Sequence, residues 1–296
     1  LASGIGGVLD AKAKSIDNAE VMFVEDLVRE INPVKDAVAF FKLKAIMKTG
    51  RYDIVHPHSS KAGIIGRFAA RAADVPLIVH TVHGFSFNDF ISPVLKYVYV
   101  LLEQAAARTT DSFIAVTGED VKKGALYGIG DPGDYTLIHS GVELDRFRKA
   151  DSARIRREFG INDGVPVVGM VACFKPQKDP LAFVEAAEIV SREVPEALFI
   201  MAGDGELRPR IEAEIEKRGL NPRFILAGWR LDIQDVMACF DVLVLTSLWE
   251  GLPRVFAEAM VMGKPVVATA VDGAREAIED GRNGFLVEPK HPEQAA

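Results

Sequence analysis

The chain has 296 residues, of which 49% are hydrophobic and 26% are charged, and its formal net charge at pH 7 is −7. This length exceeds the usual size of a single hydrophobic core and predicts two domains of ordinary globular composition. The acidic balance argues against nucleic acid as the main partner, and no apolar run approaches the length of a membrane span. The cysteines Cys173 and Cys239 have no C-x-x-C partner and stand in apolar surroundings, which is typical of reduced core residues in a cytoplasmic protein.

Strand and helix patterns alternate along the first half of the chain. The expected strands are 20–24, 53–57, 76–81, 112–116 and 135–139. Helical patterns fill the gaps between them, as at 34–48, 62–73 and 93–108. Short apolar strands that alternate with helices predict a parallel sheet that is covered on both faces.

The second half repeats this alternation. The expected strands are 166–173, 197–202, 223–227, 241–246, 265–269 and 284–287, and the expected helices are 180–193, 206–218, 232–239 and 253–262. Two such units in series predict an α/β protein with two Rossmann-like, doubly wound parallel-sheet domains. The segment 147–165 is polar and interrupts the strand rhythm, so the domains are expected to span 1–147 and 148–296.

Two glutamates, Glu250 and Glu258, flank the junction between the strand pattern at 240–246 and the helical pattern that follows it. Pro253 suits the first turn of that helix, because its missing N–H costs nothing there. Glu250 and Gly251 would then lie at the helix mouth, where backbone N–H groups and the helix dipole favour an anion. An anion-binding mouth with two carboxylates suits a ligand with both phosphates and hydroxyls, such as a nucleotide sugar. The plainer interpretation is one dipole-favoured charge and one solvated helix face.

Ligands of open parallel sheets bind beyond the carboxyl ends of the strands, so the residues that follow each strand are candidates. Lys175 and Lys178 follow the strand at 166–173 and can neutralise a diphosphate. Gly203 and Gly205 follow the next strand, where glycine lets the backbone approach a ligand closely. An ordinary surface loop and a plain turn remain the alternatives for these two segments.

Four of the six histidines follow strands of the first domain: His56, His58, His80 and His83. A zinc site is one interpretation. Single histidines that act on phosphate or sugar hydroxyls are favoured, because no H-E-x-x-H motif occurs and no carboxylate or cysteine ligand stands beside them. No D-x-D pair occurs either, so a carboxylate-held metal that bridges a diphosphate is not indicated.

The aromatic and apolar stretch 85–102 follows these histidines. Core or interface packing is the commoner explanation for such a stretch. The alternative is an amphipathic surface for a lipid-linked acceptor.

Together these motifs resemble the retaining GT-B glycosyltransferases of family 4, also called group 1, over nearly the whole chain. The segments that carry the resemblance are Glu250-Gly251-Leu252-Pro253 through Glu258, then 263–269 and 280–287, with support from 140–147, 175–179 and 203–205. The resemblance implies two Rossmann-like domains that face a cleft. It also implies that the first strand with its glycine-rich loop precedes Leu1 and that the final helix follows Ala296, so the first domain is expected to be incomplete.

The resemblance implies a role for each matching residue. The catalytic residues would be His83, which faces the donor sugar, Lys178, which neutralises the diphosphate, and Glu250, which binds sugar hydroxyls. The donor-binding residues would be Lys175, Gly203, Gly205, Arg230, Gly251, Leu252 and Glu258, the last of which would hold the ribose. His58 and Lys61 would lie on the acceptor side. The family usually has an arginine where this chain has Cys173, and Lys175 would replace that charge.

The resemblance therefore predicts a retaining, metal-independent glycosyltransferase. It would move a sugar from a nucleotide-diphosphate sugar, with UDP favoured, to an acceptor hydroxyl in cell-surface polysaccharide or lipid-linked glycan synthesis. No cofactor and no nucleic acid are expected, and the enzyme would be cytoplasmic, with peripheral contact to the inner face of the membrane as an option. The alternatives are a nucleotide-sugar 2-epimerase of the same architecture and a non-catalytic nucleotide-sugar-binding module.

Overall fold

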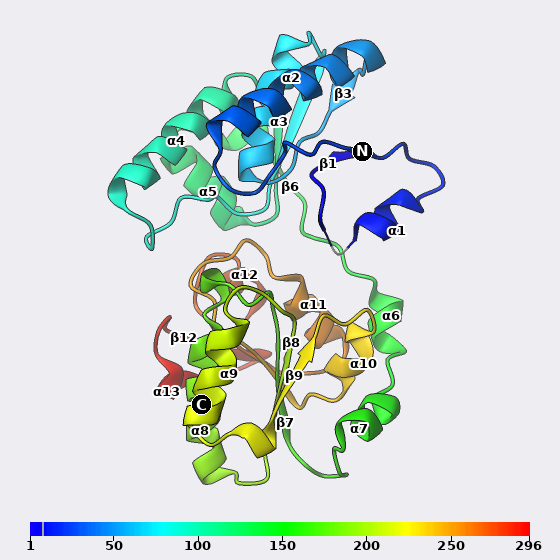
Figure 1. Ribbon diagram of the computed structural model, residues 1–296. Helices are drawn as coiled ribbons and strands as arrows, with labels where there is room; N and C mark the ends of the chain where they lie inside the picture. The colour runs from blue at the N-terminus through cyan, green and yellow to red at the C-terminus, as the bar shows by residue number, and fades with distance from the viewer. Residues whose placement is uncertain (8) are drawn as a thin grey trace. The chain divides into compact units, whose positions relative to one another are not determined.

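The computed structural model describes residues 1–7 and 9–296. It divides into two compact units, Leu1–Ile138 and His139–Ala296, which are coloured from blue to green and from green to red in Figure 1. Each unit contains its own parallel sheet, as the alternation of strands and helices predicts.

The first unit is built on a four-stranded parallel sheet with the order β3-β4-β5-β6. Its strands are β3 (Ile54–Val55), β4 (Leu77–Val82), β5 (Ser112–Ala115) and β6 (Tyr135–Leu137). Its main helices are α2 (Pro33–Gly50), α3 (Ser60–Ala72), α4 (Pro93–Ala107) and α5 (Gly118–Leu126). The first of these helices begins where the sequence favours it, because the Asn32 side chain accepts the N–H of Lys35 at 3.1 Å and Pro33 occupies the first turn.

A small sheet at the start of the chain differs from the expectation. β1 (Ala2–Ser3) pairs in parallel with β2 (Met22–Phe23), and α1 (Asp10–Lys14) lies between them in sequence. A strand was predicted at 20–24 but none was predicted at the first residues. The missed strand has only two residues, which is too short to show any periodicity.

The second unit contains a six-stranded parallel sheet with the order β12-β11-β10-β7-β8-β9. Its strands are β7 (Val167–Val171), β8 (Leu198–Ala202), β9 (Phe224–Gly228), β10 (Val242–Leu245), β11 (Val266–Thr269) and β12 (Gly284–Val287). Numbered within the unit, this order is 3-2-1-4-5-6, the doubly wound order in which the topology reverses between the first and fourth strands. Here those two strands are β7 and β10, so a ligand is expected beyond their carboxyl ends.

Two groups of helices pack around this sheet. α8 (Pro180–Glu193) contacts α9 (Arg208–Lys217) and α13 (Pro292–Ala295), whereas α10 (Ile233–Ala238) and α11 (Arg254–Val261) contact α6 (Leu144–Arg148). The shorter elements are α7 (Ala153–Phe159), α12 (Ala274–Ala277) and the 3₁₀ turns η1 (Pro132–Asp134), η2 (Pro176–Lys178) and η3 (Asn221–Arg223). Figure 1 shows the strands β7, β8 and β9 between the two groups.

The helix α6 belongs to the second unit, although the predicted boundary after Phe147 assigns most of it to the first. Phe147 is 4% exposed and lies in the apolar core of the second unit, and the helix contacts α10 and α11. The division between the units therefore falls between Ile138 and His139, nine residues earlier than predicted.

Throughout residues 1–7 and 9–296, none of the helices has both the length and the apolar composition that crossing a membrane requires.

Candidate active site

The loops that follow β7 and β10 are joined to each other by hydrogen bonds. The N–H of Leu248 donates to the carbonyl of Gln177 at 2.8 Å, and the Gln177 side-chain amide donates to the carbonyl of Trp249 at 2.8 Å. The Thr246 hydroxyl donates to the carbonyl of Asp179, also at 2.8 Å. These bonds fix the two loops against each other at the topological switch point of the sheet.

The Glu250 carboxylate and the Lys178 ammonium meet between these loops. They form an ion pair in which the two side chains are only 7% and 17% exposed, respectively. The Ser247 hydroxyl donates to Oε1 of Glu250 at 2.5 Å, and the backbone N–H of Glu250 donates to Oδ2 of Asp272 at 2.8 Å. The structure thus brings two of the predicted catalytic residues together. It holds Glu250 both through its carboxylate and through its backbone N–H.

The helix α11 begins directly after this pair, as the sequence predicts. Pro253 stands at its N-cap with extended backbone angles, and the first helical residue is Arg254. Gly251 and Leu252 precede it, and the carbonyl of Gly251 accepts the N–H of Gly273 at 3.1 Å. α11 begins four positions after Glu250, so its N-terminal N–H groups follow closely in sequence on one member of the ion pair. Such N–H groups favour an anionic ligand.

Glu258 lies on α11, and it is 8% exposed. Its nearest cation is Arg254, at 3.9 Å between Nη2 and Oε1. Within the described part of the chain, no hydrogen bond reaches the Glu258 carboxylate. Burial raises the pKa of Glu258, an effect that the charges of Arg254 and Arg146 partly oppose. A buried carboxylate with unfilled acceptor positions suits a ligand that supplies hydroxyl donors.

Glycine is required at Gly203 and Gly205 by contacts within the protein. Their φ angles are +139° and +157°, and a Cβ at Gly203 would lie 1.8 Å from the carbonyl oxygen of Ala172. A Cβ at Gly205 would lie 2.5 Å from the carbonyl oxygen of Phe174. The loop after β8 thus packs directly on the backbone of the loop after β7. Contact of these glycines with a ligand stays a prediction.

Lys175 stands at the start of η2, in the same loop as Lys178. Its backbone N–H donates to the carbonyl of Cys173 at 2.8 Å, and both residues are partly exposed. This turn places Cys173 and Lys175 close together. That Lys175 replaces the charge of the arginine that the family usually has at the position of Cys173 stays a prediction.

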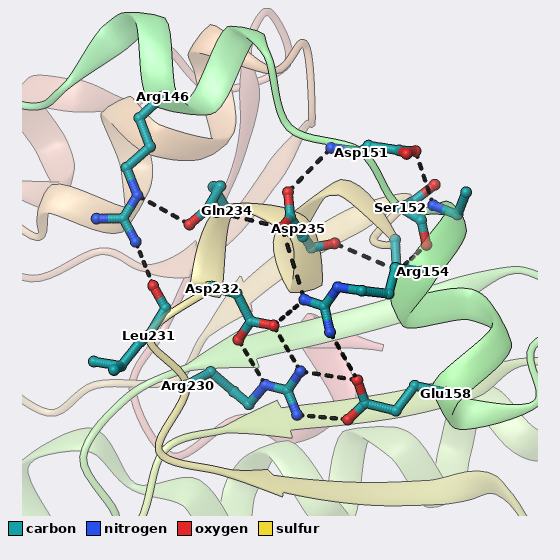
Figure 2. A network of polar contacts seen from close by, with 12 residues as sticks. Arg146, Asp151, Ser152, Arg154, Glu158, Arg230, Leu231, Asp232, Gln234 and Asp235 are labelled. Atoms are coloured by element: carbon teal, nitrogen blue, oxygen red, sulfur yellow. Dashed lines mark hydrogen bonds and ion pairs between the residues drawn. The ribbon is translucent and has the colours of Figure 1, made fainter.

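Arg230 belongs to a network of charged side chains, which Figure 2 shows. Its guanidinium donates to both carboxylate oxygens of Glu158, at 2.6 and 3.0 Å, and to both oxygens of Asp232, each at 2.8 Å. These two carboxylates raise the pKa of the Arg230 guanidinium. Arg154 also binds Asp232 and Glu158. The network joins α7 to the segment between β9 and α10. Arg230, which was predicted to bind the donor, therefore uses its guanidinium for contacts within the protein.

In the first unit, the histidines that follow β3 and β4 form a cluster. His58 Nδ1 and His83 Nε2 are 3.1 Å apart, and the ring centroids of His56 and His58 are 4.2 Å apart. His56 Nε2 hydrogen-bonds to the Thr81 hydroxyl at 2.6 Å. Burial lowers the pKa of each of these three histidines, which favours neutral imidazoles near pH 7.

The same cluster does not support the zinc interpretation. Among the described residues, no group of three or more histidine, cysteine, aspartate or glutamate side chains has the arrangement needed to hold a metal ion. The buried His80 instead shares a hydrogen bond of 3.0 Å between Nδ1 and the carbonyl of Pro57. Its burial lowers its pKa to about 3, so its proton sits on Nδ1 as the donor.

Lys61 was predicted on the acceptor side, and the structure gives it partners within the first unit. Its ammonium donates to the carbonyl of Val28 at 3.0 Å and to that of Glu30, and it pairs with the Asp36 carboxylate at 2.5 Å. These contacts tie α3 to α2 and to the segment that precedes it. An acceptor-side role stays a prediction for Lys61, as it does for His58.

Sequence reasoning missed the residues that hold Glu250 in place. Ser247 and Asp272 contact it directly, and Gln177 and Thr246 join the two loops that flank it. Ser247 lies three positions before Glu250, directly after the strand pattern at 240–246, so a hydroxyl at a strand end was an available signal. Asp272 lies three positions after the end of β11, so the rule that functional residues follow strand ends was the one signal that could have marked it.

Known families match both units. Residues 151–296 match the family described as "Glycosyl transferases group 1", and residues 18–146 match "Glycosyltransferase Family 4". The chain therefore belongs to the group 1, family 4 glycosyltransferases, and the two Rossmann-like doubly wound domains of the predicted GT-B fold are confirmed.

Individual relatives agree with this membership. A UDP-Gal:alpha-D-GlcNAc-diphosphoundecaprenol alpha-1,3-galactosyltransferase of Escherichia coli is 38% identical over 277 residues, which is 92% of this chain and 72% of the relative. A D-inositol 3-phosphate glycosyltransferase of Kribbella flavida is 30% identical over 86% of this chain and 63% of its own length. Sugar transfer in glycan synthesis is thus the function of this chain, and the epimerase and the non-catalytic module are not favoured.

Solved structures give the same fold. The complex of Anabaena HepE with UDP-glucose matches with a TM-score of 0.78 and 26% identity, over 93% of this chain and 74% of HepE. The sucrose-phosphate synthase of Thermosynechococcus elongatus matches with a TM-score of 0.79 and 21% identity, over 93% and 72% of the two chains.

Proposed function

We propose that this glycosyltransferase transfers a hexose from a UDP-sugar to a hydroxyl of a carbohydrate or lipid-linked acceptor, with retention of configuration and without a metal ion. The bond between the anomeric carbon and the diphosphate breaks, a bond to the acceptor oxygen forms on the same face of the sugar, and the proton of the acceptor hydroxyl passes to the departing diphosphate. The observation that carries the proposal is the meeting of Lys178 and Glu250 beside the N-terminus of α11, at the carboxyl ends of β7 and β10.

The site supplies positive charge where the leaving group requires it. Negative charge grows on the diphosphate as the glycosidic bond breaks, and a fixed ammonium with a helix N-terminus stabilises that charge without reorganising. Lys178 and the start of α11 are the groups proposed for this task, and Lys175 lies three positions earlier in the same loop as Lys178. Because these groups can carry the charge, we propose that no divalent ion is needed.

The carboxylates would bind the hydroxyls of the donor. Glu258, whose carboxylate lacks hydrogen-bond donors in the described protein, would accept bonds from the ribose. Glu250 would accept a bond from the transferred sugar. The choice of UDP rests on the UDP-Gal named for the Escherichia coli relative and the UDP-glucose named for HepE.

The acceptor is proposed to be lipid-linked, as is the diphosphoundecaprenol substrate named for the Escherichia coli relative. Helix α4 offers a surface for such a substrate, because one face of it is apolar and exposed. The exposed side chains are Val94, Tyr97, Val98, Leu101 and Leu102. Of its two charged residues, Glu103 is buried against Arg67 of α3, at 2.5 Å, and Lys96 pairs with Asp89, at 2.7 Å. A helix with its apolar face outward suits the interface of a bilayer. The free thiols of Cys173 and Cys239 fit a reducing compartment, so we place the enzyme on the cytoplasmic side of that membrane.

A donor panel tests the reaction. The full-length protein is mixed with UDP-galactose, UDP-glucose, UDP-N-acetylglucosamine and GDP-mannose, and the correct donor is expected to raise the melting temperature most, because it binds the folded state. Turnover is then measured with and without a lipid-linked acceptor, and the anomeric configuration of the product is read by NMR. Release of UDP from the donor in the absence of any acceptor, at the rate seen with it, would favour the epimerase.

Vesicle binding tests the surface of α4. The double substitution Tyr97→Glu and Leu101→Glu is expected to abolish flotation with phospholipid vesicles and to lower turnover of the lipid-linked acceptor but not of a water-soluble one. Leu126→Glu is the matched control, because Leu126 is a 79% exposed leucine on α5. Equal loss in the control and the double variant would contradict a specific role for α4.

A further inference from the structure

The two carboxylate oxygens of Glu250 have different surroundings. Oε1 accepts the Ser247 hydroxyl at 2.5 Å and also pairs with the ammonium of Lys178. Oε2 receives no hydrogen bond from any residue that the structure describes. The protein therefore holds this carboxylate by one oxygen and leaves the other available as an acceptor.

Ser247 is itself held tightly. It is 1% exposed, it lies two positions after the end of β10, and its carbonyl accepts the Thr269 hydroxyl at 2.5 Å. A hydroxyl has one proton to donate, and here that proton goes to Glu250. The Ser247 hydroxyl is thus held in a fixed position near the end of the strand, from which it donates a hydrogen bond to the Glu250 carboxylate.

Lys178 and Ser247 respond differently when the sugar nucleotide binds. In the proposed function the Lys178 ammonium turns to the diphosphate, so its bond to Glu250 weakens at that moment. Ser247 has no such competing partner, and it remains the donor that keeps Oε1 in place.

We propose that Ser247 is a positioning residue, whose hydroxyl holds Oε1 of Glu250 so that Oε2 accepts a hydrogen bond from a hydroxyl of the transferred sugar. This assignment rests on the proposed function, because it requires a sugar nucleotide in the site. It adds a residue that discriminates the sugar nucleotide from the bare nucleotide, since UDP lacks the transferred sugar whose hydroxyl would bind Oε2 of Glu250.

Calorimetry on the full-length protein tests the proposal with Ser247→Ala. The quantity measured is the ratio of the dissociation constant of UDP to that of the UDP-sugar that the donor panel selects. The ratio is expected to fall about tenfold, as for the loss of one hydrogen bond to a charged group, while the affinity for UDP stays within about twofold of the original. Turnover at saturating donor is expected to fall as well. Ser247→Thr keeps the hydroxyl and is expected to restore the ratio.

Thr117→Val is the control, because it removes a buried hydroxyl from the N-cap of α5, in the first unit, without touching Glu250 or the loops beside it. It is expected to lower the melting temperature and to leave the ratio unchanged. In a Glu250→Ala background, Ser247→Ala is expected to cause no further change in the ratio, because the two residues act as one unit. If Ser247→Ala does not fold, Ser247→Cys, with a weaker donor, takes its place in both comparisons.

Two results would overturn the proposal. One is an unchanged ratio in folded Ser247→Ala or Ser247→Cys. The other is an equal loss of affinity for UDP and for the UDP-sugar, which a merely structural role produces. Failure of the unmodified protein to bind UDP at all would instead contradict the proposed function, so the two failures are distinguishable.

Discussion

Lys178 and Glu250 lie 72 positions apart in the chain, and their side chains form an ion pair at the switch point of the second sheet. Both side chains are largely buried, so each charge is neutralised by the other in the free protein. A diphosphate that binds there competes with Glu250 for the ammonium. Removing either partner leaves the other buried without a counter-charge, which is costly. Stability and turnover must therefore be measured together for any variant of this pair.

We expect Lys178→Ala to lower turnover at saturating donor about 100-fold, the scale on which one preorganised charge acts, and to weaken donor binding much less. The reason is that negative charge on the leaving diphosphate is largest in the transition state. Lys217→Ala serves as control, because Lys217 is a 71% exposed lysine on α9. Lys175→Ala is expected to be damaging as well, and Cys173→Arg to be tolerated. Full turnover in Lys178→Ala would exclude the leaving-group role.

Glu258→Ala is expected to weaken nucleotide binding by roughly 1.5–3 kcal/mol, because a charged hydrogen-bond acceptor is lost. Calorimetry with UDP measures this directly. An unchanged dissociation constant would remove Glu258 from the site.

Replacing Glu258 is expected to raise the stability of the free protein, although it weakens nucleotide binding. Burial raises the pKa of Glu258, so the folded state loses stability as the pH rises from the ordinary glutamate pKa through the raised one. Glu258→Gln removes that cost and is expected to raise the melting temperature at pH 7 to 8, with no gain near pH 4. A variant that is less stable than the unmodified protein at pH 8 would show that the carboxylate has a stabilising partner.

Chelation of divalent ions is expected to leave activity intact. The positive charge of Lys178 and the N-terminus of α11 are proposed to neutralise the diphosphate, and the sequence has no D-x-D pair. Turnover is measured in EDTA and then with added magnesium or manganese. Strict dependence on either ion would contradict the proposal.

The first unit is expected to lose stability on acidification because of His80. Its pKa is lowered to about 3 by burial, so the unfolded chain binds a proton that the folded protein does not. Stability is therefore full above the ordinary histidine pKa of 6.5 and falls below it, by about 1.4 kcal/mol per pH unit at most, until about pH 3. Denaturant unfolding at several pH values measures this slope.

His80→Phe is expected to flatten that dependence, because it removes the buried imidazole. The same slope in His80→Phe as in the unmodified protein would assign the acid sensitivity to other groups, of which His56, His58 and His83 are the first candidates.

The amino-acid sequence determined the features that depend on near neighbours in the chain. The period of apolar residues predicted the strands and helices of both units, and Pro253 with the strand before it predicted where α11 begins. The motif from Glu250 to Glu258 pointed to the correct family, because both residues stand at fixed offsets from one strand–helix junction. Hydrophobic periodicity and turn chemistry act over a few residues, so they can be read locally.

Only the tertiary structure decided which side chains meet. In the folded protein Lys178 pairs with Glu250, and Ser247 donates to the same carboxylate. Arg230 binds Glu158 and Asp232, and Lys61 donates to the carbonyl of Val28. Packing also decided that α6 belongs to the second unit, because Phe147 is buried in the core of that unit. The physical reason is that a long charged side chain reaches whichever buried partner the packing of the strands brings near it, and that partner can lie tens of residues away in the chain.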